Sequence, residues 1–560
     1  MIRFHVTAVA ALTVLSVFQA SAQTVPVPGL VLPPAAEAGA LQQRQIDSEQ
    51  RRREAERELQ QPAQPLNRPD APAVAAPSVD NGVRVAVKDI RFTPSEILPA
   101  AALEQIAAEY RGRQVTLAEL QQLVERVNGL YKQKGVVTAT ATIPQQDVTG
   151  GVIEVRLVEG RVGEVRIEGN ATTSTAFITP RLGLAAGQLV DLDKLEQSLV
   201  RFNRTNDVRL QADLLPGQVF GTTDLRVAVV EPPKHELLAT LDNLGSKLTG
   251  EWRAGLSYRN RSLLGWRDEL ALSYTRARGQ DSRAASYAVP FNRFGGRVSL
   301  GLYEDRTAIK YGALAPLDIT GNSRATVLSV RQPVWIDARS QWDLVAGAKQ
   351  RVSSNYISDV FLQRTDSKDH SFGAEWQWGA DTSSVTASYI KYWANATVFE
   401  RMKYQIDRAS LRYTQALGSG LSLRTGIGGQ WAHDKNLPSG EQYFLGGEGS
   451  VRGYPVGAFS GDQGYALSAE LHHPLLATRL GTQDLAATGF FFVDHGRTSP
   501  YRPPASVLGA REKLTGIGWG LNAAIGTRTS LRVTLGFGLD DVPLTRRNHQ
   551  VTMQLISSLL

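Results

Sequence analysis

The sequence predicts a membrane all-β protein, in which a sixteen-stranded antiparallel transmembrane β-barrel (235–560) follows an N-terminal helix and two small α/β domains. Three observations carry this prediction. Apolar and polar residues alternate throughout the second half of the chain, aromatic residues are concentrated there, and the chain begins like a secreted protein. It contains no cysteine, which excludes disulfides, thiolate catalysis and cysteine-based metal sites.

The barrel is predicted from sixteen alternating segments of about ten residues, beginning with "ELLATLDNLG" and ending with "QVTMQLISSLL". Such alternation places side chains in turn toward lipid and toward the lumen, and an even number of strands suits a closed antiparallel barrel. A soluble β-sandwich is the alternative. All nine tryptophans lie between Trp252 and Trp519, and fourteen of the sixteen tyrosines follow residue 250. Aromatic girdles at two membrane interfaces require this bias, so the barrel is favoured.

The N-terminus has the features of a signal peptide. Arg3 precedes an apolar run from Val6 to Phe18, and the small residues Ala20 and Ala22 follow. We expect cleavage after Ala22, which makes residues 1–22 a signal peptide. Beyond it, no segment approaches the roughly 18 apolar residues of a spanning helix. Export, the absence of cysteine and a barrel together predict the outer membrane of a Gram-negative cell.

The next two segments precede any predicted core. Glu37–Gln61 contains no proline and is rich in Glu, Arg, Gln and Ala, which favour helix. A helix that is polar on every side must lie in water or in a wet cavity, and a disordered tail is the alternative. Residues 62–82 are rich in Pro and Ala and predict an extended linker.

Two α/β units are predicted next, over 83–161 and 162–233. Each has the order strand, helix, helix, strand, strand, which indicates a duplicated small domain. In the first unit we expect one strand over 83–92, and Thr116 and Glu119 form a capping box at the start of the second helix. Neither unit carries a nucleophile motif or a metal cluster, so both are interpreted as binding modules.

No catalytic, metal or cofactor site is predicted. The chain lacks G-x-S-x-G, and "HELLA" lacks the second histidine of H-E-x-x-H. His472 and His473 are adjacent on a predicted strand and should face opposite sides. The glycine-rich "GIGWG" lacks the strand–turn–helix setting of a phosphate loop. The net charge of +7 comes without a basic, aromatic-interleaved cluster, which argues against a nucleic-acid partner.

A glycine-rich loop, "LGGEGSVRGYPVGAFSGDQG", carries Arg452 between the eleventh and twelfth predicted strands. On the thirteenth strand, Phe492, Asp494 and Gly496 share one face, and we expect Asp494 to point into the lumen. A planar guanidinium can bind a carboxylate bidentately, and neighbouring glycines allow the loop to fold inward. Spacing alone leaves two alternatives open. Either Arg452 pairs with Asp494, or the arginine is solvated and the two never meet.

The motifs "VRGY" (Val451–Tyr454) and "FVDHG" (Phe492–Gly496) resemble the paired signatures of outer-membrane transporters with periplasmic POTRA domains. With sixteen strands, two preceding units, a helix and a linker, the chain resembles the two-partner secretion transporters, the TpsB (ShlB/FhaC/HecB) family. The resemblance implies a helix that plugs the barrel and a loop inside the pore. It also implies the functional residues: the loop motif Val451, Arg452, Gly453 and Tyr454, with Arg452 paired to Asp494, and the wall motif Phe492, Asp494 and Gly496. The family's barrels usually end in an aromatic residue, so Leu560 implies a weaker assembly signal.

The resemblance further implies a type V secretion function without an enzymatic activity. The chain would move one large partner exoprotein, an adhesin, haemolysin or contact-dependent toxin, from periplasm to cell surface. The POTRA units would capture the partner's N-terminal secretion domain by strand addition. Outer-membrane lipids and the outer-membrane assembly machinery would be the other partners. An insertase for outer-membrane proteins and, less well supported, a passive porin are the alternatives.

Overall fold

The computed structural model describes residues 36–47, 66–67, 84–134, 136, 138–433, 437–501, 512–542 and 549–560. The predicted signal peptide lies outside these residues, as do the second half of the predicted N-terminal helix and most of the predicted linker. Residues 38–47 are helical. Among the described residues, no helix has the length and apolar character needed to cross a membrane.

The first α/β unit contains two helices packed on a three-stranded sheet of order β3-β6-β5. Its elements are β2 (Arg84–Ala86), β3 (Asp89–Phe92), α2 (Ala100–Ala108), β4 (Gln114–Thr116), α3 (Leu117–Gln133), β5 (Ala139–Thr142) and β6 (Val152–Glu159). The Thr116–Glu119 capping box begins α3. The single strand expected over 83–92 was wrong. The backbone N–H of Val87 bonds to Arg113, whereas that of Lys88 bonds to Gly151, so β2 pairs with β4 and β3 pairs with β6.

The second α/β unit has the sheet order β1-β8-β9-β7. Its elements are β7 (Arg161–Glu168), α4 (Thr175–Leu182), α5 (Leu192–Thr205), β8 (Arg209–Pro216) and β9 (Thr222–Val230). The short β1 (Leu66–Asn67), from the predicted linker, pairs in parallel with β8. The helix α5 buries a stripe at helical spacing, namely Leu192, Leu195, Leu199 and Phe202.

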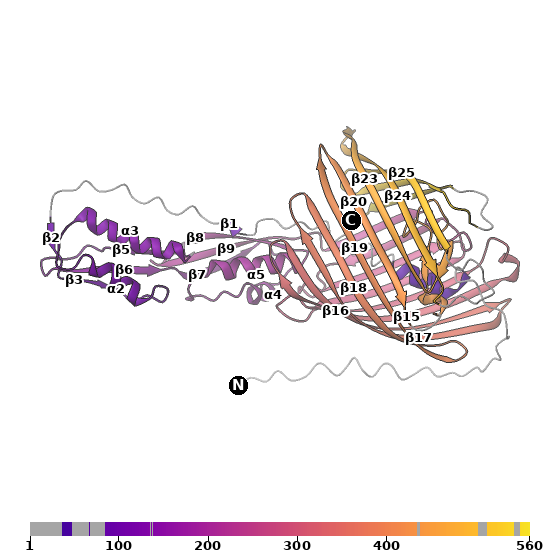
Figure 1. Cartoon of the computed structure of the whole chain (residues 1–560), viewed down its shortest axis with the longest axis horizontal. Helices are drawn as coiled ribbons and strands as arrows, with labels where there is room; N and C mark the ends of the chain where they lie inside the picture. Colours follow the sequence, from indigo (N-terminus) through magenta and orange to yellow (C-terminus); the bar gives the residue numbers. More distant parts are fainter. Residues whose placement is uncertain are drawn as a thin grey trace.

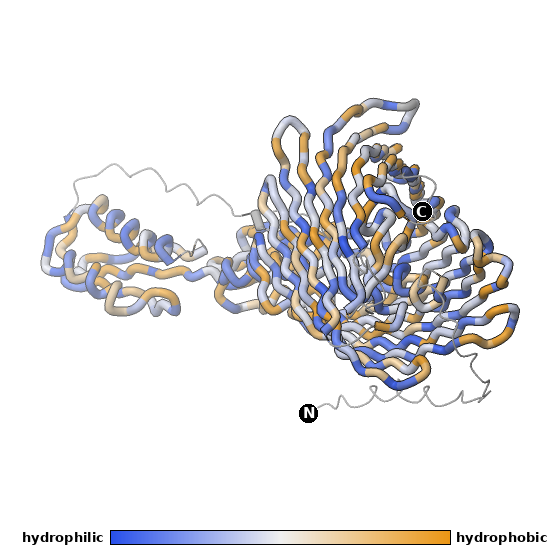
Figure 2. Tube along the Cα trace, turned by 45° about the vertical axis from the view of Figure 1, so that its right-hand side comes forward, coloured by the Kyte–Doolittle hydropathy of each residue, from blue (hydrophilic) through white to orange (hydrophobic). Residues whose placement is uncertain are grey.

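The predicted sixteen-stranded antiparallel barrel is confirmed, and its strands close in the order β10 to β20 and then β23 to β27. They are β10 (His235–Asp242), β11 (Arg253–Asn260), β12 (Glu269–Ala277), β13 (Gln280–Pro290), β14 (Arg297–Ala308), β15 (Ile319–Ile336), β16 (Ser340–Ile357), β17 (Val360–Gly379), β18 (Ser383–Thr397), β19 (Arg401–Gly418), β20 (Leu421–Ala432), β23 (Gln463–Leu480), β24 (Gln483–Ser499), β25 (Glu512–Ile525), β26 (Thr529–Gly538) and β27 (His549–Ser558). Hydrophobic and hydrophilic residues alternate along these strands (Figure 2). The closing seam is short, because only Leu238–Asp242 of β10 pair with Gln554–Ser558 of β27.

The two α/β units lie in line and lead to one end of the barrel (Figure 1). The second unit contacts the barrel directly. Arg267, in the turn between β11 and β12, is fully buried, and its Nε donates to Asp207 Oδ1 at 2.9 Å. The backbone N–H of Ser174 donates to the carbonyl of Gly265 in the same turn at 2.9 Å. Asp207 is 21% exposed and also pairs with Arg261, whereas loss of Asp207 would leave the buried Arg267 guanidinium without this carboxylate, so the contact helps to hold the second unit on the barrel rim.

Candidate functional site in the barrel lumen

The loop between β20 and β23 folds against the inner wall of the barrel. It contains a 3₁₀ turn, η3 (Ser439–Glu441), and a small hairpin of β21 (Tyr443–Leu445) and β22 (Phe459–Gly461). Three of its apolar side chains are buried together with Leu514 of β25, namely Leu445, Val451 and Tyr454. Burial of this cluster orders a loop whose glycine content would otherwise favour many conformations.

Arg452 and Asp494 lie together, and both are buried, with 5% and 1% of their side chains exposed. Arg452 Nε and Nη2 donate to Asp494 Oδ2 and Oδ1, each at 2.7 Å. The backbone N–H of Arg452 donates to Oδ2 at 3.0 Å. The carboxylate of Asp494 therefore holds both the side chain and the backbone of the loop tip. The two guanidinium donors on its two oxygens form a bidentate pair, which a lysine could not form.

Alternation along β24 places Asp494 toward the loop. Phe492 is buried on the same face, whereas Phe491 and Val493 on the other face are 70% and 54% exposed. The guanidinium carbon of Arg452 lies 3.7 Å from the ring centroid of Phe492, a cation–π contact. Gly496 lies against the loop, because a Cβ there would stand 2.5 Å from Leu445 and 3.1 Å from Val451.

A second carboxylate, Glu470 of β23, also binds Arg452 and was not predicted from the sequence. Arg452 Nη1 donates to Glu470 Oε1. Arg532 of β26 reaches the same oxygen at 3.3 Å, and His472 Nε2 lies 2.7 Å from Oε2. Glu470 pairs with Phe492 across the β23–β24 ladder, so only knowledge of the register would have placed it beside Arg452. His472 is buried and His473 is exposed, consistent with opposite faces.

The loop tip fits into a slot made by glycines. A Cβ on Gly516 would stand 2.0 Å from the carbonyl oxygen of Arg452, and one on Gly538 would stand 2.5 Å from the ring of Tyr454. Gly453 itself has a φ of 94°, which disfavours other residues. The Tyr454 hydroxyl donates to the carbonyl of Thr515 on β25 at 2.8 Å, which fastens the loop tip to the wall. Gly516 belongs to "GIGWG", whose role in packing was missed because strand glycines are usually considered as weak points or bulges.

The described part of the N-terminal helix, residues 38–47, lies inside the barrel (Figure 1). Ser323 Oγ of β15 donates to Gln42 Oε1 at 2.6 Å, and the backbone N–H of Ala38 donates to Asn355 at 3.1 Å. Arg351 of β16 bonds to Gln43 at 3.0 Å and to Glu441 of the loop at 2.6 Å. The helix and the loop therefore share one buried arginine of the wall.

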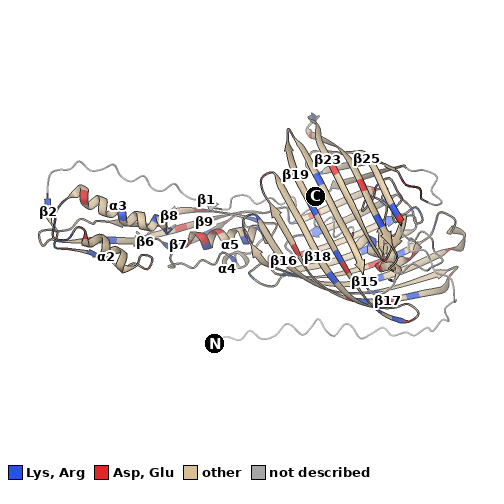
Figure 3. Ribbon diagram, viewed as in Figure 1, with Lys and Arg blue, Asp and Glu red and all other residues tan. Residues whose placement is uncertain are grey.

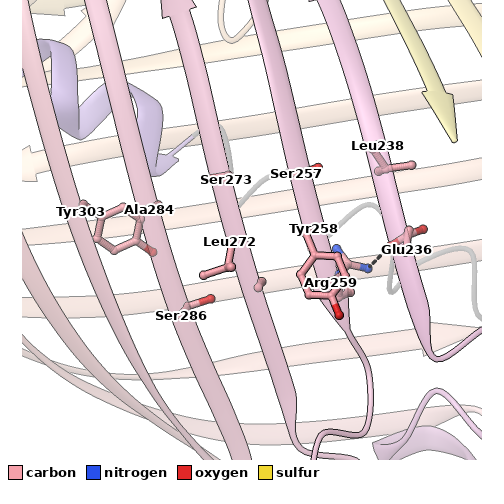
Figure 4. A pocket seen from close by; sticks show the side chains of 11 residues that line it. Glu236, Leu238, Ser257, Tyr258, Arg259, Leu272, Ser273, Ala284, Ser286 and Tyr303 are labelled. Carbon is pink, nitrogen blue, oxygen red and sulfur yellow. Dashed lines mark ion pairs between the residues drawn. The ribbon is translucent and has the colours of Figure 1, made fainter. Parts of the chain in front are cut away.

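A shallow recess in the wall over β10 to β14 is not lined by a set of side chains that could act together in catalysis (Figure 4). Its lining includes Ser257, Ser273 and Ser286 but no histidine that would activate a serine. Glu236 and Arg259 form an ion pair there at 3.3 Å. Within the described ranges, no group of three or more His, Asp or Glu side chains is arranged to hold a metal ion.

Two family models match this chain. The family "Haemolysin secretion/activation protein ShlB/FhaC/HecB" matches residues 221–523, and the "POTRA domain, ShlB-type" matches residues 85–160. The heme/hemopexin transporter protein HuxB of Haemophilus influenzae is 23% identical over 483 residues, covering 81% of this chain and 84% of the relative. The outer membrane transporter CdiB of Dickeya dadantii is 25% identical over 459 residues, covering 78% and 80%.

Solved structures share the fold. CdiB from Escherichia coli superposes with a TM-score of 0.66 at 20% identity, covering 95% of this chain and all of that one. BamA from Haemophilus ducreyi lacking POTRA domains 1–3 superposes with a TM-score of 0.51 at 13% identity, covering 85% of this chain and all of that one. More than half of the chain matches one family of outer-membrane transporters that export partner exoproteins, in which the members are transporters and not enzymes. The chain therefore belongs to the ShlB/FhaC/HecB family of haemolysin secretion/activation proteins.

Proposed function

We propose that this chain is an outer-membrane translocator that secretes one large partner exoprotein, such as an adhesin, haemolysin or contact-dependent toxin, from the periplasm to the cell surface. Family membership supports the class of function. The observation that carries the mechanism is the buried contact of Arg452 with Asp494, because it positions a long loop within the lumen. Residues 451–454 and Phe492, Asp494 and Gly496 are the proposed functional residues.

The proposed orientation places both α/β units in the periplasm, following a signal peptide over residues 1–22. The N-terminal helix would act as a plug, which its hydrogen bonds to Ser323 and Asn355 of the wall support. The proposed boundaries are a helix over 37–61, a linker over 62–82, POTRA units over 83–161 and 162–233, and a barrel over 235–560. When the plug is displaced, the open lumen would conduct ions as a porin does.

Capture of the partner's N-terminal secretion domain would occur by addition of a strand to a POTRA sheet. In the first unit, β5 is the last strand of the order β3-β6-β5, so its outer edge has no partner among the described strands. Main-chain pairing tolerates variation in the added sequence. The periplasm supplies no ATP, so folding of the β-rich partner outside the cell would drive translocation. The chain would require no catalytic residue or cofactor, and its own insertion would depend on the outer-membrane assembly machinery.

The test is deletion of the gene. We expect one large exoprotein to disappear from the cell surface and culture medium while other outer-membrane barrels keep their abundance. If several barrels decline instead, the chain is an insertase, the alternative that shares its fold. If neither changes, the translocator function is wrong.

A further inference from the structure

The outward face of the barrel carries a group of arginines close to the end that lies away from the α/β units. Ser323 of β15 faces the lumen, because its hydroxyl donates to Gln42 of the N-terminal helix at 2.6 Å. Side chains alternate along a strand, so Arg324 faces outward. The Arg324 side chain is 75% exposed.

The register of the neighbouring strands brings three further arginines onto this face. Arg324 pairs across the ladder with Glu304 of β14, which pairs with Arg283 of β13. Arg306 pairs with Asp281, which pairs with Arg276 of β12. We call this set the arginine cluster: Arg276, Arg283, Arg306 and Arg324.

Two carboxylates contact three of the four arginines without neutralising the cluster. Glu304 lies 3.4 Å from Arg306 and 3.2 Å from Arg324, and Asp281 lies 3.3 Å from Arg283. Four arginines against two carboxylates leave a charge of +2 on this patch. The side chains of Arg283 and Arg306 are 57% and 64% exposed, so their guanidinium groups have donors available to a ligand.

The cluster begins where the apolar surface of the same strands ends. Closer to the α/β units, the outward face presents Leu272 of β12, Leu302 of β14 and Leu328 of β15, each more than 40% exposed. Exposed leucines suit hydrocarbon, whereas arginine on the lipid face becomes tolerable only near the interface. The cluster therefore lies at the level of the lipid headgroups, in the leaflet away from the α/β units. Both acidic and basic residues occur on the strands of the barrel (Figure 3).

We propose that the arginine cluster binds the phosphate groups of the phosphorylated glycolipid that forms the outer leaflet of the Gram-negative outer membrane. The inference rests on the proposed function for its orientation, with the α/β units in the periplasm. Guanidinium forks bind phosphate oxygens bidentately, and several exposed forks on adjacent strands match a headgroup that carries more than one phosphate. The acyl chains of the same lipid would lie against the leucines beneath.

The experiment uses the full chain reconstituted in phosphatidylcholine vesicles, alone, with diphosphoryl lipid A, or with dephosphorylated lipid A. The readout is the temperature at which the heat-modifiable barrel unfolds. We expect diphosphoryl lipid A to raise this temperature for the wild type and the dephosphorylated form to raise it less. The variant Arg283→Gln/Arg306→Gln/Arg324→Gln should lose the difference between the two lipids, and Arg324→Gln alone should reduce it.

Arg479→Gln provides a matched control. Arg479 pairs with Asp484 at 3.1 Å beside the β23–β24 turn on the opposite rim, and both side chains are 80% exposed. This variant should keep the wild-type response. An equal response to both lipids, an undiminished response in the triple variant, or the same rise with inorganic phosphate would overturn the proposal. A triple variant that fails to insert is detected in plain phosphatidylcholine, and the single variant then decides. Because secretion is not measured, failure here is distinct from failure of the translocator function.

Discussion

At the scale of single residues, Arg452 is the group on which the loop tip depends. Hydrogen bonds to charged groups contribute roughly 1.5–3 kcal/mol, which is little for a sixteen-stranded barrel but enough to position one loop. We expect Arg452→Ala to remain folded and inserted while secreting far less partner. Arg452→Lys should be tolerated only in part, because lysine keeps the charge but loses the fork. Secretion measured beside barrel abundance tests both.

Asp494, the carboxylate that binds Arg452, supplies the control for this prediction. Asp494→Ala should resemble Arg452→Ala, and the double variant should be little worse than either, because all three remove the same interaction. Glu470 keeps one contact to Arg452 in Asp494→Ala, so that variant should be no more severe than Arg452→Ala. Defects that multiply in the double variant would mean that the two residues act separately.

The glycine slot yields a second prediction. In Gly516→Ala the new methyl group would meet the carbonyl oxygen of Arg452, and a backbone atom cannot move aside as a flexible side chain can. We expect the barrel to assemble, the loop to be displaced and secretion to fall. Gly379→Ala is the control, because no atom lies within 4 Å of a Cβ at that position. Equal secretion by the two variants would show that the slot does not hold the loop.

The sequence predicted part of this site for clear physical reasons. Period-two alternation is sufficient to turn Asp494 and Phe492 to the same face. Whether Arg452 reaches Asp494 depends on the path of a long loop, so that question stayed open without the family resemblance. Glu470, Arg532 and Gly516 escaped prediction because they lie on three different strands. Their proximity depends on registers that no single segment encodes.

At the scale of elements, the N-terminal helix gives a prediction about conductance. Deleting residues 37–61 should increase single-channel conductance in planar bilayers and leave the barrel assembled, because the described part of the helix occupies the lumen. Arg351→Gln is a milder variant that loses the positive charge bound by both Gln43 and Glu441. The pore of this variant should open more often than that of the wild type. Unchanged conductance in the deletion would place the segment outside the conducting path.

Glu159 in the first α/β unit gives a prediction about the effect of acid on stability. Burial alone would raise the pKa of Glu159, but hydrogen bonds from Ser95, the backbone of Glu96 and Tyr131 lower the pKa below its usual value. A depressed pKa adds stability above the unfolded value of about 4.3 and loses it as pH falls through the folded pKa. Hydrogen exchange in this unit should therefore accelerate in acid. In Glu159→Gln, the backbone amides of this unit should exchange faster at neutral pH, and their exchange should accelerate less in acid. If acid accelerates exchange as much in this variant as in the wild type, the Glu159 carboxyl is not the cause.

The elements themselves were largely predictable, because strand alternation and capping residues are local signals. All sixteen barrel segments found by alternation correspond to strands. The failure over 83–92 has a tertiary cause, since the chain changes sheets at Val87 and Lys88 where two different strands offer acceptors. Likewise, polarity on every side of the N-terminal segment was compatible with a helix in water or in a wet cavity and with a disordered tail, and only its hydrogen bonds to Ser323 and Asn355 place the described part in the lumen.

At the scale of the whole molecule, the first α/β unit and the barrel should have separable roles. Removing residues 83–161 should abolish secretion and leave a heat-modifiable barrel in the outer membrane, because this unit has its own core and its own sheet. Arg91→Gln is a control within the same unit, since this arginine is largely exposed and its ion pair with Asp89 lies within one strand. Normal secretion by the deletion would contradict a role for this unit in capture.

The ion pair of Arg267 and Asp207 has a mechanical consequence. It fastens the second unit to the turn that joins β11 to β12, and the chain of that unit runs on directly into β10. The strand β10 is also one side of the short seam that closes the barrel. Tension applied to the second unit by a polypeptide drawn toward the pore would thus act as torque on β10 and β11. This torque would fall beside the shortest strand pairing of the barrel, that between β10 and β27.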